Sequence, residues 1–315
     1  MLVDAHCDAL GRLRAQGVGL DERGGQVDLL RLERLSPCIE TFAVYVGPEF
    51  LPDGALRETL ELIARFRAEV RRLAGRLKPV LWARDVDDVR GVGALLSVEG
   101  AEALGQSTAL VDLLFDLGVR MLSLTWNRRN LLADGAWESP GGPLSRAGHA
   151  VLVRLEELGI LADVSHLSPG SFWSLARSAT RPLCASHSNA RALCEHPRNL
   201  TDDQLRAVAD SGGVVGLNFY PAFLTTAPAA TEADLVAHAL HLAEVMGAEH
   251  VGLGTDFDGI PTTPAGYPGV EALPDFGVAL AGAGFSRSEV DGIMGGNWAR
   301  LLRQSLPAEE DDRCE

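Results

Sequence analysis

The chain has 315 residues, of which 46% are hydrophobic and 23% are charged, and its formal net charge is −15 at pH 7. This composition is typical of a globular protein with a sizeable core, and the acidic excess argues against nucleic acid or an anionic membrane as the partner. No apolar run approaches the roughly 20 residues of a membrane-spanning helix. The N-terminus lacks a basic region followed by an apolar stretch, so we expect no signal peptide.

Cysteine use predicts the compartment. The chain contains Cys7, Cys38, Cys184, Cys194 and Cys314, which are scattered and odd in number. No two of them have the CxxC spacing, so neither a disulfide scaffold nor a zinc ribbon is expected. A reducing compartment fits this pattern best, and we predict the cytoplasm.

Strand-like and helix-like segments alternate from the first residue. Residues 1–8 read as a short apolar strand that ends in His6 and Asp8. Side chains two positions apart on a strand point to the same face, so an imidazole and a carboxylate should project together, with Cys7 turned away. An amphipathic surface helix is predicted over residues 52–77, followed by a short side strand over 80–82.

Later helices follow start signals in the sequence. Ser168-Pro169 places a capping residue before a proline at the first helical position, and Thr201 is a second N-cap candidate. The Gly- and Pro-rich loop 127–143 is long enough to be functional. Helices are predicted over residues 108–117, 144–158, 168–178, from 201 onward, and over 231–246. Two more helical stretches are expected within 274–306, before an acidic tail, 307–315, that should be flexible.

The count of strands predicts the fold class. Eight principal strands are expected, near residues 2, 40, 95, 121, 162, 184, 215 and 252. Strands that alternate with helices indicate βαβ units and a parallel sheet, and eight units match a single-domain (β/α)8 TIM-type barrel. An open doubly wound sheet is the alternative. No glycine-rich phosphate fingerprint follows the first strand, which argues against its dinucleotide-binding form.

Five predicted strands end in metal-capable side chains. Catalytic residues of a barrel lie at the carboxyl ends of its strands, and here these residues are His6, Asp8, Glu99, His166, His187 and Asp256. Imidazole and carboxylate suit zinc and related ions, and two metals need about this many ligands. Each residue alone could be a hydrogen-bonded loop residue or a helix cap, but six at equivalent ends indicate a metal centre. The remaining histidines, His196 included, are interpreted as surface or packing residues.

The same segments resemble a known family. The motifs, in chain order, are His6-x-Asp8, Ser97-Val98-Glu99-Gly100, Leu124-Thr125-Trp126-Asn127, Asp163-Val164-Ser165-His166, Ser186-His187-Ser188, Arg198-Asn199-Leu200-Thr201-Asp202, Asn218-Phe219-Tyr220 and Gly254-Thr255-Asp256-Phe257-Asp258-Gly259. Together they resemble the renal (membrane) dipeptidase family, the M19 metallopeptidases of the amidohydrolase superfamily. The likeness covers nearly the whole chain.

The resemblance implies a metal-dependent hydrolase with a binuclear zinc centre. It implies that His6, Asp8 and Glu99 bind one Zn²⁺, that Glu99, His166 and His187 bind the other, and that Glu99 bridges the two. Asp256 would then handle the proton, and Arg198 would bind the substrate carboxylate. The lysine count agrees with a carboxylate bridge, because the single lysine, Lys78, follows a predicted surface helix and is not placed to be a carbamylated bridge.

Two positions depart from the family pattern. Trp126 stands where vertebrate members have a histidine, and Phe223 falls where they have a substrate-binding tyrosine; Tyr220 is the candidate replacement. The resemblance implies a zinc-dependent dipeptidase that has Trp126 and Tyr220 beside the substrate and includes dipeptides with a C-terminal D-residue among its substrates. A metal-bridged hydroxide would attack the peptide carbonyl, and Asp256 would act as acid and base.

Three alternatives remain open from the sequence. The first is another amidohydrolase that acts on N-acyl amino acids, esters or lactams, and the second is a non-catalytic barrel that serves as a binding protein. The third concerns Arg198, which could be a solvated loop residue or pair with Asp202 or Asp203. Dimers are common in the family, so a homodimer is the expected assembly if the chain associates at all.

Overall fold

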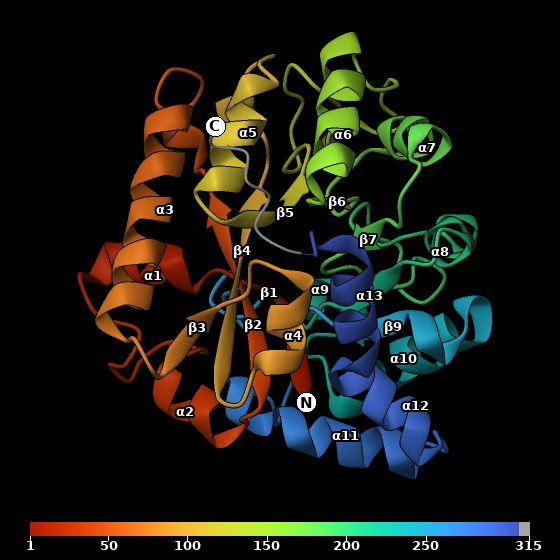
Figure 1. Cartoon of the computed structure of the whole chain (residues 1–315). Coiled ribbons are helices and arrows are strands. Elements are labelled where there is room, and N and C mark those ends of the chain that lie inside the picture. The colour runs from red at the N-terminus through yellow and green to blue at the C-terminus, as the bar shows by residue number, and fades with distance from the viewer. Residues whose placement is uncertain (309–315) are drawn as a thin grey trace.

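Eight parallel strands close into a barrel that helices surround (Figure 1). The structure, a computed structural model, describes residues 1–308. The strands are β1 (Leu2–Cys7), β2 (Cys38–Tyr45), β3 (Leu77–Pro79), β4 (Val92–Glu99), β5 (Val119–Ser123), β6 (Leu161–Asp163), β7 (Cys184–Ala185), β8 (Val214–Leu217) and β9 (Val251–Leu253). The predicted (β/α)8 barrel is therefore confirmed. The predicted flexibility of the tail falls on residues 309–315, which lie outside the described residues.

Closure of the barrel depends on β2 and β4. The sheet runs in the order β2-β1-β9-β8-β7-β6-β5-β4, and β2 also pairs with β4 in parallel from Cys38–Val92 to Tyr45–Glu99. β3 lies outside this ring and pairs with the first residues of β4, Val92 to Ala94, before β5 takes over that side of β4. The side strand exists as β3, Leu77–Pro79, but its predicted position at 80–82 was wrong, because Trp82 is already the N-cap of α4 (Ala83–Asp88).

Helices follow most strands. They are α1 (Ala9–Gln16), α2 (Leu29–Arg34), α3 (Ala55–Arg72), α4 (Ala83–Asp88), α5 (Ala109–Asp116), α6 (Arg146–Leu158), α7 (Pro169–Ser178), α8 (Asp202–Asp210), α9 (Pro221–Leu224), α10 (Glu232–Met246), α11 (Leu273–Gly282), α12 (Arg287–Asp291) and α13 (Asn297–Ser305). Ser168 and Thr201 cap α7 and α8 with their side chains, as predicted. The C-terminal region holds three helices where two stretches were expected, because a π-helical turn at Gly292–Gly296 separates α12 from α13.

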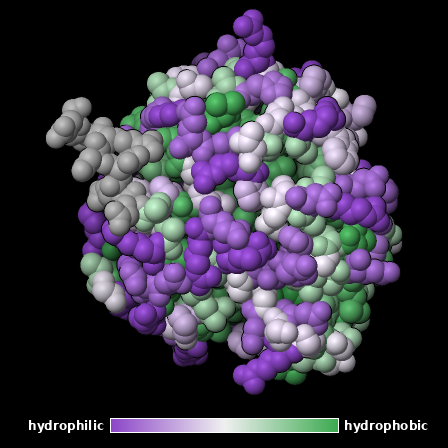
Figure 2. Space-filling model, turned by 45° about the vertical axis from the view of Figure 1, so that its right-hand side comes forward, coloured by the Kyte–Doolittle hydropathy of each residue, from purple (hydrophilic) through white to green (hydrophobic). Residues whose placement is uncertain are grey.

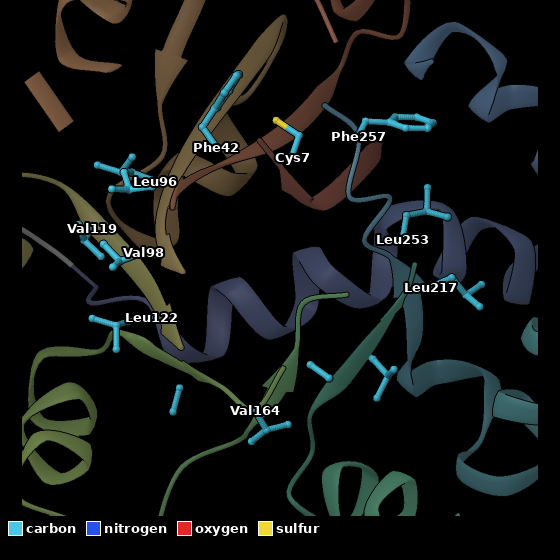
Figure 3. Packing of buried hydrophobic residues seen from close by; sticks show 14 of the residues in the cluster. Cys7, Phe42, Leu96, Val98, Val119, Leu122, Val164, Leu217, Leu253 and Phe257 are labelled. Atoms are coloured by element: carbon cyan, nitrogen blue, oxygen red, sulfur yellow. The ribbon is translucent and has the colours of Figure 1, made fainter. Parts of the chain in front are cut away.

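Two apolar layers hold the barrel. In Figure 3 side chains such as Phe42, Leu96, Leu122 and Leu253 point away from the barrel axis, toward the layer that also contains helical residues. A second cluster fills the barrel itself with strand residues, and Trp298 of α13 joins it. Helix α13 lies across the end where the strands begin, so the opposite end, where they finish, is left for the site.

The surface is consistent with the acidic composition. Hydrophilic side chains cover most of the face in Figure 2, with apolar ones scattered between them. Within residues 1–308, no helix combines the length and the apolar content that crossing a membrane would need.

Candidate metal centre

The predicted strand-end residues meet at one end of the barrel. His6 lies in β1, and Asp8 follows it. Glu99 ends β4, and His166, His187 and Asp256 come two or three residues after β6, β7 and β9. All but His6 line a cavity of about 600 Å³, and His6 is buried directly beneath it. Strands that run parallel bring their carboxyl ends to one rim, which is why residues 250 positions apart come together.

Glu99 is the centre of the cluster. Its Oε1 lies 2.7 Å from His166 Nε2, 3.5 Å from His187 Nε2 and 3.7 Å from His6 Nε2. His6 Nε2 is also 3.5 Å from Asp8 Oδ2. Two groups have ligand atoms within 4.8 Å of one another, one of His6, Glu99 and His187 and one of His6, Asp8 and Asp256. These are candidate groups for holding a metal, they share His6, and they are not divided as the resemblance implied.

In His166 and His187, the hydrogen bond made by Nδ1 determines the tautomer and therefore the state of Nε2. His166 Nδ1 donates to Asn127 Oδ1 at 2.8 Å. His187 Nδ1 donates to Ser186 Oγ at 2.7 Å, since that hydroxyl gives its own proton to Asp163 Oδ2 at 2.5 Å. Both Nε2 atoms consequently carry lone pairs, yet they lie 2.8 Å apart beside Glu99. The Glu99 carboxyl group and the two imidazole lone pairs converge on one place, which fits a divalent cation, and carboxylate- or carbonyl-oriented histidines are typical of metal sites.

The charges of the cluster point the same way. Burial lowers the pKa values of His166 and His187 well below the usual range, so both rings are neutral, as ligands must be. Burial also opposes the charge of His6, but Glu99, Asp8 and Asp256 together raise the pKa of His6 to about 10. Burial raises the pKa of Glu99 well above its ordinary value. Carboxylates that attract a proton this strongly would attract a metal cation instead.

Backbone conformation at the rim is unusual. Among residues 1–308, the non-glycine residues with positive φ are His166, Asp256 and Asp258, at 72°, 65° and 66°, and all three line the cavity. Such conformations cost free energy and persist where surrounding contacts impose them. Here the backbone N–H of Asp256 donates to the His6 carbonyl at 3.1 Å. A Cβ on Gly259 would lie 2.1 Å from Asp8 Oδ2, so this loop closes tightly over the cluster.

Asp256 is hydrogen-bonded to a neutral side chain at the cavity. Its Oδ2 accepts from Asn218 Nδ2 at 2.9 Å. Burial raises its pKa to about 6, against the opposing charge of His6. Its loop is anchored one residue earlier, where Thr255 donates its N–H and its hydroxyl to Asp4 at 2.8 and 2.5 Å. A carboxyl group with a pKa in this range can both accept and release a proton near neutral pH.

Arg198 is buried at the cavity wall, which contradicts the solvated-loop alternative. Its side chain is 3% exposed, its Nη2 donates to the His187 carbonyl at 3.3 Å, and its Nε has no partner among the described residues. Burial lowers its pKa to about 10, with Glu99 and Asp256 opposing that change, so it stays charged at neutral pH. Asp202 and Asp203 instead pair with His241 and Arg206.

Several cavity residues were not identified from the sequence. His196, interpreted there as a packing residue, lines the cavity and stacks on Phe223 with ring centroids 4.4 Å apart. Tyr220, which the sequence did indicate as a substrate-binding candidate, also lines the cavity and meets Phe223 edge-on at 4.9 Å. Tyr45 and Trp137 complete the opposite side beside Trp126. The available signals were the position of His196 two residues before Arg198 and the place of Tyr45 at the end of the strand predicted near residue 40.

Comparisons with known proteins agree with this geometry. The profile of the family described as membrane dipeptidase (peptidase family M19) matches residues 1–312. A dipeptidase of Aspergillus oryzae named aclJ is 32% identical over 95% of this chain and 76% of its own length. A protein of Klebsiella pneumoniae, described as uncharacterised and encoded in the pqqA 5' region, is 39% identical over 73% of this chain and 89% of its own length.

Solved structures show the same relationship. A metallopeptidase of Rhodobacter sphaeroides, liganded with a phosphinate mimic of the dipeptide L-Ala-D-Ala, superposes with a TM-score of 0.91 at 29% identity, covering 96% of this chain and 99% of its own. A metallopeptidase described as dipeptidase AC of family M19 gives 0.89 at 30% identity, with 97% and 98% covered. The family profile and the identity to these relatives establish that this chain belongs to the membrane dipeptidase family, peptidase family M19.

Proposed function

We propose that the protein hydrolyses the peptide bond of dipeptides at this centre, with two Zn²⁺ ions held by His6, Asp8, Glu99, His166 and His187 and bridged by Glu99. The observation that carries the proposal is the convergence of Glu99 Oε1 with the Nε2 atoms of His166 and His187. Imidazole and carboxylate are ligands that zinc accepts readily. When bound, two such ions supply a Lewis acid for the carbonyl and lower the pKa of water.

Proton transfer is assigned to the side chains of the protein. Asp256 takes a proton from the attacking water and delivers it to the nitrogen of the leaving amine, for which a pKa raised to about 6 is suited. Asn218 keeps the Asp256 carboxylate directed by its 2.9 Å hydrogen bond. No side chain needs to act as a covalent nucleophile, and Cys7 is fully buried among apolar residues.

Arg198 is assigned to the C-terminal carboxylate of the dipeptide. It is a buried cation at the cavity wall, and its Nε is unpaired among the described residues, whereas Nε of Arg12, another arginine that lines the cavity, pairs with Asp258. Tyr220 and Trp126 line the same cavity and would contact the substrate. The cavity of about 600 Å³ lies within the range of small-ligand sites. The L-Ala-D-Ala mimic bound to the Rhodobacter sphaeroides metallopeptidase supports a dipeptide with a C-terminal D-residue as one substrate.

The test is hydrolysis over a panel of L,L and L,D dipeptides after chelation and after zinc is restored. We expect chelation to abolish hydrolysis and about two zinc ions per chain to restore it, with N-acetyl amino acids turned over far more slowly. Metal analysis of the purified protein gives the stoichiometry. Full activity in the presence of a strong chelator, or faster turnover of N-acyl amino acids than of any dipeptide, would contradict the proposal.

Two further proposals concern setting and assembly. We propose the cytoplasm as the compartment, supported by Cys7, Cys38, Cys184 and Cys194, which are free and buried. Homodimerisation stays a prediction from the family resemblance, and sedimentation velocity of the metal-loaded protein would check it.

A further inference from the structure

Three aromatic side chains form one side of the cavity. Tyr45 ends β2, Trp126 follows β5, and Trp137 comes from the short 3-10 turn Ala136–Glu138 in the loop 127–143. Trp126 lies between the other two, with ring centroids 5.2 Å from Tyr45 and 4.9 Å from Trp137. All three line the cavity, and we call them the aromatic wall. Contacting aromatic rings at these separations make a cohesive, rigid apolar surface.

The aromatic wall begins at the metal centre. Trp126 stacks on the ring of His166, with centroids 5.9 Å apart and an interplanar angle of 29°. The guanidinium carbon of Arg128 lies 4.8 Å from the Trp126 ring centroid and further restrains that ring. A substrate group that touches Trp126 is therefore the group nearest to the bond being cleaved.

The aromatic wall and Arg198 lie on opposite sides of the rim. The wall comes from the ends of β2 and β5, whereas Arg198 and Phe223 follow β7 and β8. In the closed sheet, β6 separates these two arcs on one side and β9 with β1 on the other. A dipeptide that places its C-terminal carboxylate at Arg198 and its peptide bond at the metal centre must direct its N-terminal residue to the aromatic wall.

Part of the aromatic wall is exposed to solvent at Trp137. It is 60% exposed, although it is among the largest apolar side chains of the protein. Its own loop is well anchored, because Trp137 N donates to the Asn127 carbonyl and Ala136 N to the His166 carbonyl. A fixed, exposed indole at a cavity mouth is an apolar surface that a ligand side chain can cover.

We propose that the aromatic wall binds the side chain of the N-terminal residue of the dipeptide and selects aromatic and large apolar residues at that position. This inference rests on the proposed dipeptidase function, because the substrate's direction is set by its carboxylate at Arg198. Burying a phenyl side chain is worth a factor of roughly ten to a hundred in affinity or kcat/KM. The three rings carry no charge, and the Arg128 guanidinium packs against Trp126.

The experiment compares kcat/KM for L-Phe-L-Ala with that for Gly-L-Ala in the zinc-supplied enzyme and in Trp137→Ala and Trp126→Ala. We expect the Phe-Ala to Gly-Ala ratio to exceed about ten in the parent enzyme and to fall roughly tenfold in each variant. Trp173→Ala is the matched control, because Trp173 packs on Phe172 in α7 and does not line the cavity. Binding of both dipeptides to Asp256→Asn, with and without Trp137→Ala, gives the same ratio without turnover.

The outcomes separate the two proposals. If neither dipeptide is hydrolysed by the zinc-supplied parent enzyme, the proposed function fails. If dipeptides are hydrolysed but the ratio is unchanged by Trp137→Ala and Trp126→Ala, or falls equally in Trp173→Ala, the aromatic wall is not the subsite. If the variants alter the preference between L-Ala-L-Phe and L-Ala-Gly instead, the wall binds the C-terminal residue and this inference is overturned.

Discussion

At the scale of single residues, the site depends on which atoms keep a free lone pair. His187 is an example, because the chain from its Nδ1 through Ser186 Oγ to Asp163 leaves Nε2 as an acceptor beside Glu99. Asp163 also accepts the backbone N–H groups of Ser165 and Ser186 at 2.9 Å. One buried carboxylate thus orients a candidate metal ligand that it does not touch, an arrangement common in metal sites.

Removing the Ser186 hydroxyl should weaken metal binding. We expect Ser186→Ala to lower the affinity for zinc by about 10- to 100-fold, because His187 loses the acceptor that fixes its tautomer. Competition with a chromophoric chelator measures this directly. Ser188→Ala is the matched control, since Ser188 is equally buried and its hydroxyl has no partner among the described residues. Equal affinities of the two variants would show that the Ser186 hydroxyl does not act through His187.

Replacing the Asp256 carboxyl tests proton transfer at the same scale. Asp256→Asn preserves an oxygen that can accept from Asn218 Nδ2, so the fold should be unchanged. Turnover should fall by about 10²- to 10⁴-fold, which is the typical contribution of a positioned acid–base group. Dipeptide hydrolysis measures the loss, with zinc content and melting temperature as controls. Activity of roughly a tenth or more of the parent's would show that another group moves the proton.

At the scale of elements, the loop 127–143 carries function because it is tied down. The Asp134 carboxylate accepts two hydrogen bonds from Arg129 and one from the Gly142 N–H at 2.7 Å. The backbone N–H of Asp134 donates to Ser171 Oγ at 2.9 Å. The neighbouring residue, Gly135, lies so close to the backbone of Trp126 and Asn127 that a Cβ would approach within 2.3 Å. These contacts hold Asn127 against His166 and Trp137 at the cavity.

The Asp134 carboxylate should make the order of this loop depend on pH. The hydrogen bonds from Arg129 lower the pKa of Asp134, against the effect of burial. A lowered pKa in the folded state means that the stabilisation is present above the ordinary value of about 4 and is lost as the pH falls through the lowered value. Hydrogen exchange over residues 127–143 should therefore be slow at pH 7 and faster in Asp134→Asn at that pH.

A control defines what would contradict this expectation. Asp112→Asn removes a comparable partner of Arg154 on the surface of α5, away from the cavity, and should leave exchange in the loop unchanged. If Asp134→Asn exchanges like the parent protein over residues 127–143, the carboxylate does not hold the loop, and its other contacts suffice.

At the scale of the whole molecule, the barrel is closed at one end and functional at the other. Trp298 is fully buried where the strands begin, and its Nε1 donates to the Leu253 carbonyl at 2.9 Å. Gly252 is required beneath it, because a Cβ there would lie 2.2 Å from Nε1. The packing of the barrel where its strands begin therefore depends partly on α13.

Truncating Trp298 should destabilise the protein without altering the site chemistry. We expect Trp298→Ala to lower the free energy of unfolding by about 3–5 kcal/mol, since it leaves a cavity and removes the hydrogen bond to the Leu253 carbonyl. Val278→Ala, at a side chain that is 72% exposed, should change it by less than about 0.5 kcal/mol. Urea unfolding of both variants measures the difference. A loss below about 1 kcal/mol for Trp298→Ala would show that α13 is not a closing element.

Much of the architecture could be predicted because strands and helix starts depend on residues that are close in the sequence. The eight strands follow from apolar runs, and the starts of α7 and α8 follow from Ser168 and Thr201, whose side chains cap helices in the structure. The C-terminal region was harder, because the π-helical turn at Gly292–Gly296 forms against β1, where a Cβ on Gly295 would lie 2.5 Å from the Met1 carbonyl. A contact between the two ends of the chain leaves no local periodicity to detect.

The sequence by itself determined that His6, Asp8, Glu99, His166, His187 and Asp256 share one rim, because parallel strands in a closed barrel bring all their carboxyl ends to the same side. It also determined the family, through motifs that keep their order along the chain. Only the tertiary structure decided that Arg198 is buried, that His196 faces the cavity, and that Tyr45, Trp126 and Trp137 form one wall. These features depend on loop conformations, which long-range contacts impose and which no spacing along the chain specifies.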